Sequence, residues 1–217
     1  MRSPLLGALP AEEVELLMRT ARRRQFARNE VVFHRGDPAD TLHLIHRGRF
    51  AVRITTPLGD TVIVAVLGPG DCFGELALFG GGERSASVVA LEAGETRSLH
   101  QLDVGRVRRE HPELAEVLVG LLVEQVRRLS EQVVEALYVP AERRVLRRVA
   151  DLADLYAEDG SPGATIPLTQ DELANLAGTS RATVNKVLRG YEREGLIELR
   201  RGRTAVPDRA ALDARVR

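Results

Sequence analysis

Hydrophobic and polar positions change their pattern twice along the chain. From Phe26 to Leu102, short runs rich in Val, Ile and Leu alternate with turn signals such as "HRGDPAD", "TPLGD", "LGPGD" and "EAGE". Regular spacing of such signals predicts a small all-β barrel or roll. The runs "FAVRITT" and "TVIVAVL" flank Pro57–Asp60, as the two strands of a hairpin would.

One helix is predicted before this β region and a longer one after it. The segment Pro10 to Arg24 has a proline and glutamates at its start and arginines at its end, which suits the two ends of a helix dipole. From about Pro112 to Leu137, apolar residues recur at spacings of three and four. The apolar stripe of so long a helix needs a partner. That partner is either the β-roll or the same helix of a second subunit in a coiled coil, and we favour the second.

Pro140 ends the long helix and marks a domain boundary. Another helical segment, Ala141 to Tyr156, follows, and after it comes the polar loop "EDGSPGAT". The predicted fold is therefore α+β. It has a β-roll in residues 1–111, a long helix in 112–138 and a further domain in 139–217.

The segment "TQDELANLAGTSRATVNKVLRG", residues 169–190, has the features of a helix-turn-helix. Thr169 can cap a first helix, with Glu172 three residues later completing a capping box. Gly178 permits the positive φ of a tight turn, and Ser180 can cap the second helix. A small residue at the crossing and apolar anchors complete the motif: Ala174, Leu173, Leu176, Val184 and Val187. The alternative is a plain helical hairpin with a solvated charged face.

The second helix and the strands after it carry the candidate DNA contacts. The first residues of such a helix reach base edges in a major groove, where Arg and Lys read guanine. The following "LIELRRGRTAV" predicts strand, turn and strand, which form a wing. The whole chain has 31 basic and 31 acidic residues, so a surface for nucleic acid must be local. The predicted contacts are Thr169, Gln170, Ser180, Arg181, Thr183, Lys186 and Arg203.

The segment "FGELALFGGGERSASV", residues 73–88, predicts a ligand site. Gly74 lets backbone approach a ligand, and one helical turn over Glu75–Leu78 would aim free N–H groups at an anion. Arg84 supplies a bidentate countercharge and Ser85 a hydroxyl donor. Glu75 would repel a bare phosphate, so we expect its carboxylate to accept hydrogen bonds from a sugar hydroxyl. These residues together suit a nucleotide ribose phosphate.

The β-roll, the "FGELAL…ERSASV" segment, the long helix and the winged helix-turn-helix resemble the CRP/FNR family of bacterial transcription regulators, over roughly residues 10 to 206. The resemblance implies a homodimer that binds double-stranded DNA and is controlled by a cyclic nucleotide, with cyclic AMP favoured. It implies a cyclic-nucleotide-binding domain in 1–111, a dimerisation helix in 112–138 and a DNA-binding domain in 139–217. The implied phosphate-binding contacts are Gly74, Glu75, Leu76, Arg84 and Ser85.

Two departures from the family pattern bear on specificity. Members that bind cyclic AMP contact adenine with a Thr-Ser pair on the long helix, where this chain has Leu129 and Ser130. Ser130 can still donate from the neighbouring subunit. The recognition helix has Arg181-Ala182-Thr183-Val184-Asn185-Lys186 where the cyclic-AMP receptor pattern is Arg-Glu-Thr-Val-x-Arg. We therefore expect palindromic operators with TGTGA-like half-sites and one relaxed position, and either repression or activation through RNA polymerase.

Three alternatives stay open: a regulator without an effector, a redox or gas sensor of the same fold, and a metal-dependent β-barrel enzyme. The single cysteine, Cys72, excludes an internal disulfide and iron–sulfur or zinc sites built from cysteines. His43 and His46 are interpreted as surface strand residues, and Ser85 has no His-acid pair nearby in sequence. We therefore expect no enzyme, no metal site, no membrane segment and a cytoplasmic location.

Overall fold

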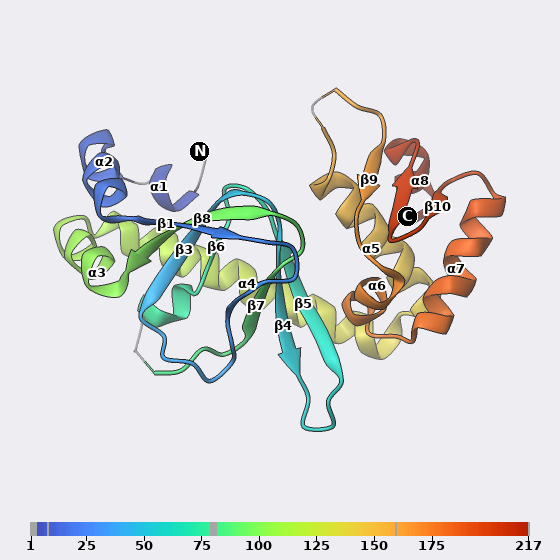
Figure 1. The fold of residues 1–217 in the computed structure, drawn as a ribbon, viewed down its shortest axis with the longest axis horizontal. Coiled ribbons are helices and arrows are strands. Elements are labelled where there is room, and N and C mark those ends of the chain that lie inside the picture. Colours follow the sequence, from blue (N-terminus) through green and yellow to red (C-terminus); the bar gives the residue numbers. More distant parts are fainter. Residues whose placement is uncertain (1–3, 8, 79–81, 159, 217) are drawn as a thin grey trace. The chain divides into compact units, whose positions relative to one another are not determined.

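The computed structural model describes residues 4–7, 9–78, 82–158 and 160–216. The chain forms two compact units, one of Met1–Asp60 with Val64–Leu129 and one of Thr61–Ile63 with Ser130–Arg217. Strands dominate the first unit, and helices dominate the second (Figure 1). The predicted α+β fold is therefore confirmed.

The β-roll consists of two four-stranded sheets, with strand orders β1-β8-β3-β6 and β2-β7-β4-β5. The predicted hairpin about Pro57–Asp60 is formed by β4 and β5, which are neighbours in the second sheet. The strands are β1 (Arg22–Phe26), β2 (Val31–Phe33), β3 (Thr41–Arg47), β4 (Phe50–Thr55), β5 (Thr61–Leu67), β6 (Cys72–Phe73), β7 (Ser87–Ala90) and β8 (Gly94–His100).

The prediction for the first helix is wrong at its C-terminal end. Helix α2 (Ala11–Thr20) begins after Pro10, but Ala21 is already extended and Arg22–Arg24 belong to β1. These arginines pair with Ser98, Arg97 and Thr96 of β8. Their positive charge suited a helix C-terminus, but pairing with a distant strand determines their structure.

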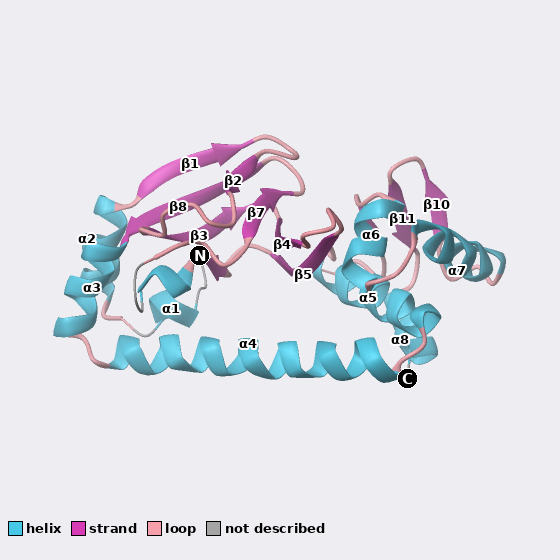
Figure 2. Cartoon of the chain, turned by 90° about the horizontal axis from the view of Figure 1, so that it is seen from below, coloured by secondary structure: helices cyan, strands magenta, loops and turns pink. Residues whose placement is uncertain are grey.

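Helices close one side of the β-roll. They are α1 (Pro4–Gly7), α2, α3 (Gln101–Glu110) and the first turns of α4 (Glu113–Tyr138). Their buried residues Leu17, Val107, Leu114 and Leu118 form one core cluster with strand residues such as Leu44. The predicted long helix is thus confirmed as a single continuous element (Figure 2), and its N-terminal turns pack against the β-roll.

The later turns of α4 expose large apolar side chains. Val126 is 62 % exposed, Val133 59 % and Leu137 70 %. The apolar stripe therefore has two parts: the first packs against the β-roll, and the second is exposed in the described part of the chain. Among the described residues, no helix is both long and apolar enough to cross a membrane.

The second unit contains the predicted helix-turn-helix and wing. Pro140 precedes α5 as its N-cap residue, as expected. The three-stranded sheet β10-β11-β9 includes a strand, β9, that the sequence did not predict. The elements are α5 (Ala141–Leu155), β9 (Ala164–Ile166), α6 (Gln170–Ala177), α7 (Arg181–Arg193), β10 (Glu198–Arg200), β11 (Arg203–Val206) and α8 (Arg209–Val216).

Candidate functional site

A cavity of about 360 Å³ lies in the first unit, between β-roll strands, the turn after β6 and one face of α4. Ligand pockets typically measure about 300–1,000 Å³. Apolar side chains line much of it, among them Phe33, Val52, Val64, Leu67, Val88 and Leu121. Predicted ligand residues also line it: Gly74, Glu75, Leu76, Arg84, Ser85 and Leu129. Ser130 is not among the lining residues.

The predicted helical turn is present as the 3-10 helix η1 (Glu75–Leu78). Gly74, directly before it, has φ of +80°, a conformation that favours glycine. A Cβ atom here would lie 2.8 Å from the carbonyl oxygen of Thr41. Gly80 and Gly81 of the glycine run lie outside the described residues.

Arg84 is buried, with 6 % of its surface exposed. Its Nη1 donates to the carbonyl oxygen of Thr41 at 2.8 Å and its Nη2 donates to the Thr41 hydroxyl at 2.7 Å. The guanidinium lies over the ring of Phe33, 4.0 Å from the ring centroid. Its Nε is buried and has no hydrogen-bond partner among the described residues. A buried charged donor without a partner is unfavourable, so this atom is suited to an anionic ligand.

The backbone of Arg84 is fixed as firmly as its side chain. Its N–H donates to the carbonyl oxygen of Asp37 at 2.8 Å, and its carbonyl accepts from the N–H of Gly36 at 2.9 Å. Ser85 follows Arg84 and is exposed at the cavity. The loop before β3 therefore holds the backbone of Arg84, while Thr41 holds its side chain.

Glu75 combines burial with nearby positive groups. Burial raises the pKa of its carboxyl, while its own backbone N–H, the guanidinium groups of Arg128 and Arg84, and the N–H of Gly74 act to lower that pKa. Two backbone N–H groups at the start of η1, those of Gly74 and Glu75, thus bond to the Glu75 carboxylate, although the N–H groups of this turn were expected to face an anionic ligand. This carboxylate is a hydrogen-bond acceptor that titrates above the usual range of glutamate.

Several cavity residues gave no signal in the sequence. Glu124, Gln125 and Arg128 lie on the α4 face that lines the cavity. Gln125 is four residues before Leu129, so a helical search from Leu129 would have found it, and Arg128 is three residues after Gln125. Thr41 is not a lining residue but holds Arg84, and it could not have been found because it meets Arg84 only through the fold. The cavity therefore has more charged groups than the predicted segment supplies.

His43 corrects the sequence interpretation. It was expected at the surface, but it is only 3 % exposed, whereas His46 is exposed as predicted. Its ring stacks on Phe73, with centroids 4.9 Å apart. Burial, and then the charge of Arg84, lowers its pKa to about 3, so the ring is neutral near pH 7.

The other candidates for chemistry have little support in the described part of the chain. Three or more His, Cys, Asp or Glu side chains arranged to hold a metal ion are not found among the described residues. Cys72 is a free, half-buried cysteine that packs against the core. Burial raises the pKa of its thiol to about 12, and Glu75 and Asp71 add to this effect, so the reactive thiolate is disfavoured.

The helix-turn-helix in the second unit has the predicted caps. The Thr169 hydroxyl accepts from the N–H of Glu172 at 3.2 Å, and the Glu172 carboxylate accepts from the N–H of Thr169 at 2.8 Å. Gly178 has φ of +59°, and the Ser180 hydroxyl accepts from the N–H of Thr183 at 3.1 Å. Because these interactions are local, the order of caps and glycine predicted the motif correctly.

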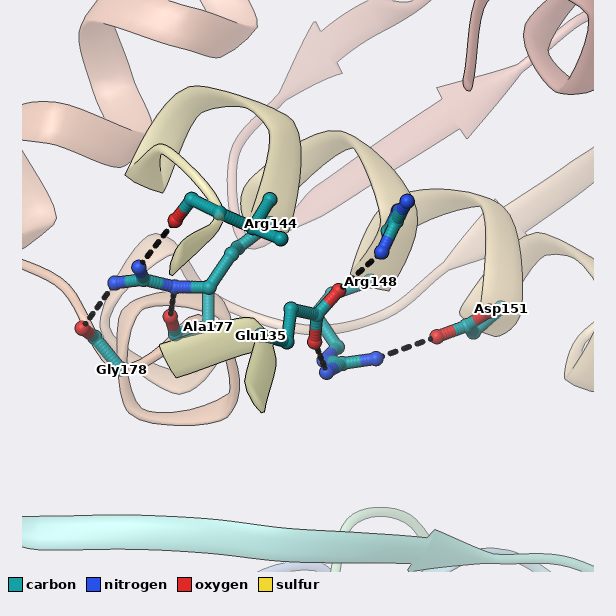
Figure 3. A network of polar contacts seen from close by, with 8 residues as sticks. Glu135, Arg144, Arg148, Asp151, Ala177 and Gly178 are labelled. Atoms are coloured by element: carbon teal, nitrogen blue, oxygen red, sulfur yellow. Dashed lines mark hydrogen bonds and ion pairs between the residues drawn. The ribbon is translucent and has the colours of Figure 1, made fainter. Parts of the chain in front are cut away.

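Arg144 joins the start of α5 to the turn of this motif (Figure 3). Its Nε donates to the carbonyl oxygen of Ala177 and its Nη2 to that of Gly178, both at 2.9 Å. Its Nη1 donates to the carbonyl oxygen of Val139 at 2.8 Å. One guanidinium thus satisfies three carbonyls, at the end of α6, in the turn and before Pro140.

A second network lies beside it (Figure 3). Glu135, near the end of α4, is buried and accepts hydrogen bonds from Arg147 and Arg148 of α5. Arg148 also donates to Asp151 at 2.9 Å. The segment after Ser130 is therefore tied to α5 by charged groups on both sides of Pro140.

The candidate DNA contacts on α7 are exposed or half-buried. Arg181 and Lys186 are exposed, and each lies near a carboxylate, of Asp171 at 3.7 Å and of Glu142 at 3.4 Å. Ion pairs this exposed contribute at most about 1 kcal/mol, so a phosphate or base can displace them. Thr183 is half-buried and bonded to the Ser180 hydroxyl at 3.0 Å.

The remaining predicted contacts lie beside α7. Gln170, the first residue of α6, accepts from the side-chain amide of Asn185 at 3.0 Å. Arg203 begins β11, which pairs with β10 across a turn where Gly202 has φ of +71°. The predicted wing is thus present, with exposed arginines at its tip.

Two family models match the chain, the cyclic nucleotide-binding domain over residues 23–111 and the Crp-like helix-turn-helix domain over residues 143–215. The "Cyclic AMP receptor protein" of Thermus thermophilus is 36 % identical over 97 % of this chain and 95 % of its own length. The "CRP-like cAMP-activated global transcriptional regulator" of Mycobacterium tuberculosis is 28 % identical over 100 % of this chain and 97 % of its own.

Solved structures agree in fold. The c-di-GMP-responsive global regulator CLP of Xanthomonas campestris superposes with a TM-score of 0.78 at 21 % identity, over 92 % of this chain and 99 % of that one. At that identity the likeness concerns the fold alone. Together with the two domain matches and the Thermus relative, it shows that this chain belongs to the CRP/FNR family of DNA-binding transcription regulators controlled by a cyclic nucleotide.

Proposed function

We propose that this regulator binds cyclic AMP in the β-roll cavity, and that it acts as a homodimer on palindromic DNA. The observation that carries the ligand site is the buried Arg84, whose Nε has no hydrogen-bond partner among the described residues. A cyclic phosphate would give this donor an acceptor, and Ser85 would add a hydroxyl. A charge-assisted hydrogen bond of this kind is about twice as strong as a neutral one.

Glu75 is assigned to the ribose. A carboxylate beside a phosphate site repels the phosphate, but it accepts hydrogen bonds from a sugar hydroxyl. The positive groups around it, Arg128 and Arg84, favour its ionised form. The apolar part of the cavity, from β4, β5 and α4, is suited to the flat faces of a base.

Leu129 supports a second candidate within the same family function. It lines the cavity at the position where cyclic-AMP-binding members have threonine, so the cavity lacks that hydroxyl. An effector other than cyclic AMP, or none, is therefore the alternative. Titration with cyclic AMP decides between the two candidates, because under the alternative cyclic AMP binds weakly or not at all.

The dimer is proposed from the exposed face of α4. Val119, Val123, Val126, Val133 and Leu137 are all exposed and follow alternating spacings of four and three, with Ser130 at the remaining position. Such a stripe is typical of a helix that pairs with a second copy in a coiled coil. Ser130 would then face the partner subunit, where it can donate to a ligand across the interface.

The DNA-binding unit is proposed to read TGTGA-like half-sites with α7. Arg181 and Lys186 would contact guanines, and the methyl group of Ala182 would contact a thymine. The wing arginines, including Arg203, would contact phosphates. A symmetric dimer must place its two recognition helices about 34–36 Å apart to enter successive major grooves. Ligand binding would bias that spacing through the segment around Pro140, and promoter binding would repress or activate through RNA polymerase.

Calorimetric titration with cyclic AMP and cyclic GMP tests the ligand site, with Arg84→Ala as the variant. We expect one cyclic AMP per subunit and loss of saturable binding in the variant. Fluorescence anisotropy with a palindromic duplex, with and without cyclic AMP, then tests control of DNA binding. Full-strength DNA binding without nucleotide, together with no heat of binding, would support the effector-independent alternative.

A further inference from the structure

The side-chain hydrogen bonds of Arg84 go to one residue, Thr41. Both of its terminal nitrogens donate to Thr41, one to the backbone carbonyl and one to the hydroxyl. The nearest carboxylate, of Asp40, is 3.9 Å away on a side chain that is 56 % exposed, which makes it a weak partner. The Thr41 hydroxyl, together with the Thr41 carbonyl and the Phe33 ring, therefore sets where the remaining guanidinium N–H groups point.

The Thr41 hydroxyl is itself oriented by a histidine. Because a guanidinium nitrogen can only donate, the hydroxyl oxygen accepts from Arg84 and its own hydrogen needs another acceptor. The Nε2 atom of His43 lies 3.4 Å from this oxygen. On the other side of the ring, Nδ1 lies 3.0 Å from the hydroxyl oxygen of Thr96.

These contacts favour one tautomer of a neutral ring. With the proton on Nδ1, His43 donates to Thr96 and accepts from Thr41, so both ring nitrogens and the Thr41 hydroxyl have suitable partners. The ring is held flat against Phe73, at an interplanar angle of 8°. Burial and the adjacent guanidinium keep it uncharged near neutral pH.

From this chain of contacts we infer that His43 is a positioning residue for the ligand site, which acts through the Thr41 hydroxyl to hold the Arg84 guanidinium in the orientation that meets an anion. The inference rests on the proposed function, because it takes the phosphate of a cyclic nucleotide as that anion. Side chains fixed in advance bind more tightly, since the ligand does not have to order them.

A double-mutant cycle with cyclic AMP as the probe tests the inference. The variants are Thr41→Val, which keeps the shape and removes the hydroxyl, His43→Phe, which keeps a flat ring, and the double variant. Loss of one hydrogen bond corresponds to about 2- to 12-fold in affinity, and we expect each single variant to weaken binding by that order. The double variant should bind no more weakly than Thr41→Val, and Thr41→Ser should bind like the wild type.

Additive losses in the double variant would overturn the inference, because they would mean that His43 acts on the fold and not through Thr41. A purely structural role would also lower the unfolding temperature in parallel with affinity. The rescue by Thr41→Ser separates the hydroxyl from the packing of the side chain. Failure of Arg84→Ala to change binding would instead refute the proposed phosphate site.

A second measurement needs no ligand and decides the case if the wild type binds neither cyclic AMP nor cyclic GMP. Nitrogen-15 NMR of the ligand-free protein reports the tautomer of His43 and the exchange rate of the Arg84 Nε–H. We expect the Nδ1–H tautomer, and faster exchange of the Arg84 proton in His43→Phe and in Thr41→Val. A ring protonated on Nε2, or an Arg84 signal unchanged in both variants, would overturn the inference.

Discussion

A Cβ atom added to Gly74 would lie 2.7 Å from Nη1 of Arg84. Such a distance is far inside van der Waals contact, and the guanidinium cannot retreat without losing its bonds to Thr41. Gly74 is therefore needed mainly because any side chain at this position would collide with the buried guanidinium of Arg84. Close approach of a ligand is the smaller reason. The two residues are separated by η1 and the glycine run, yet they form one packing unit.

Gly74→Ala should accordingly lower both the stability of the fold and the affinity for ligand. Any residue with a side chain is strained at φ of +80°, at a cost of about 1–3 kcal/mol. Displacement of Arg84 should add a loss of at least about 10-fold in affinity for cyclic AMP, by analogy with one charge-assisted hydrogen bond. Calorimetry and thermal unfolding measure the two effects.

Gly59→Ala provides the matched control. Gly59 has φ of +93° in the β4–β5 turn, and a Cβ there would meet nothing within 4 Å. The control should lose stability of a similar order and keep its nucleotide affinity. Equal losses of affinity in both variants would show that strain in the β-roll, and not the contact with Arg84, is responsible.

Affinity for cyclic AMP should fall on acidification because of Glu75. Its pKa is raised by burial, so the carboxylate takes up a proton at a higher pH than an ordinary glutamate. The protonated form is a poorer acceptor for a ribose hydroxyl, and binding weakens as pH falls through that pKa. Titrations at a series of pH values from neutral downwards test this, with Glu75→Gln as the control that should bind weakly at every pH. The same pH slope in wild type and Glu75→Gln would contradict the role of the carboxylate.

The stability of the fold should also depend on pH through His43. Burial lowers its pKa to about 3 in the fold, against the ordinary histidine value of 6.5. Arg84 and Arg24 disfavour its protonation, and Asp40 favours it. Below pH 6.5 the unfolded chain therefore binds a proton that the folded chain does not, and stability falls by about 1.4 kcal/mol per pH unit.

Urea unfolding at several pH values measures that slope. His43→Phe should lose less stability than the wild type between about pH 6.5 and pH 4, because it has no proton to bind in the unfolded state. If the free energy of unfolding had the same pH dependence in the two proteins, the ring would take up a proton as readily in the folded as in the unfolded state. That result would also weaken the positioning role of His43.

Local chemistry explains which elements were predictable. The capping box of Thr169 and the left-handed Gly178 depend on residues within a few positions, so their order in the sequence predicted the structure. Arg22–Arg24 were assigned wrongly because strand pairing with β8, more than 70 residues away, overrides their charge preference. Strand β9 was missed for the same reason, since Thr165 pairs with Ala205.

The candidate site divides in the same way. The segment from Gly74 to Ser85 could be recognised because a single stretch of chain carries most of its chemistry. Thr41 and His43 could not, because they meet Arg84 only when β3 lies beside the turn after β6. Alternation along β3 is also hidden, because four consecutive residues from Leu42 to Ile45 are buried. Because histidine is a polar residue, the sequence pattern alone predicts a surface position for His43 within this run.

Arg144→Lys should loosen the helix-turn-helix while leaving the β-roll intact. A lysine cannot reproduce three directed hydrogen bonds to Val139, Ala177 and Gly178. A hydrogen bond to a charged group contributes about 1.5–3 kcal/mol, so the variant should lose stability of that order in the second unit. Hydrogen exchange at the amides around Gly178 should rise, and DNA affinity should fall.

Arg143→Lys is the control for this change. Arg143 is the neighbouring arginine on α5 and is exposed, so its replacement keeps the charge at almost the same place. Its exchange rates and DNA affinity should match the wild type. If both variants behaved alike, the three carbonyl contacts of Arg144 would have no energetic weight, and the turn would be held by the α6–α7 packing alone.

Arg181→Ala and Arg203→Ala should weaken DNA binding in different ways. Arg181 lies at the start of α7 and is proposed to read a base, so its loss should cost about 1–3 kcal/mol on the preferred operator and relax specificity at one position. Arg203 is proposed to contact a phosphate, so its loss should weaken binding to all DNA sequences about equally and reduce the slope of log K against log salt by about 1.

Fluorescence anisotropy with the operator and with a scrambled duplex, at several salt concentrations, separates the two effects. If Arg203→Ala changed sequence preference and left the salt slope unchanged, the wing would be a base-reading element and the division of roles between α7 and the wing would be wrong.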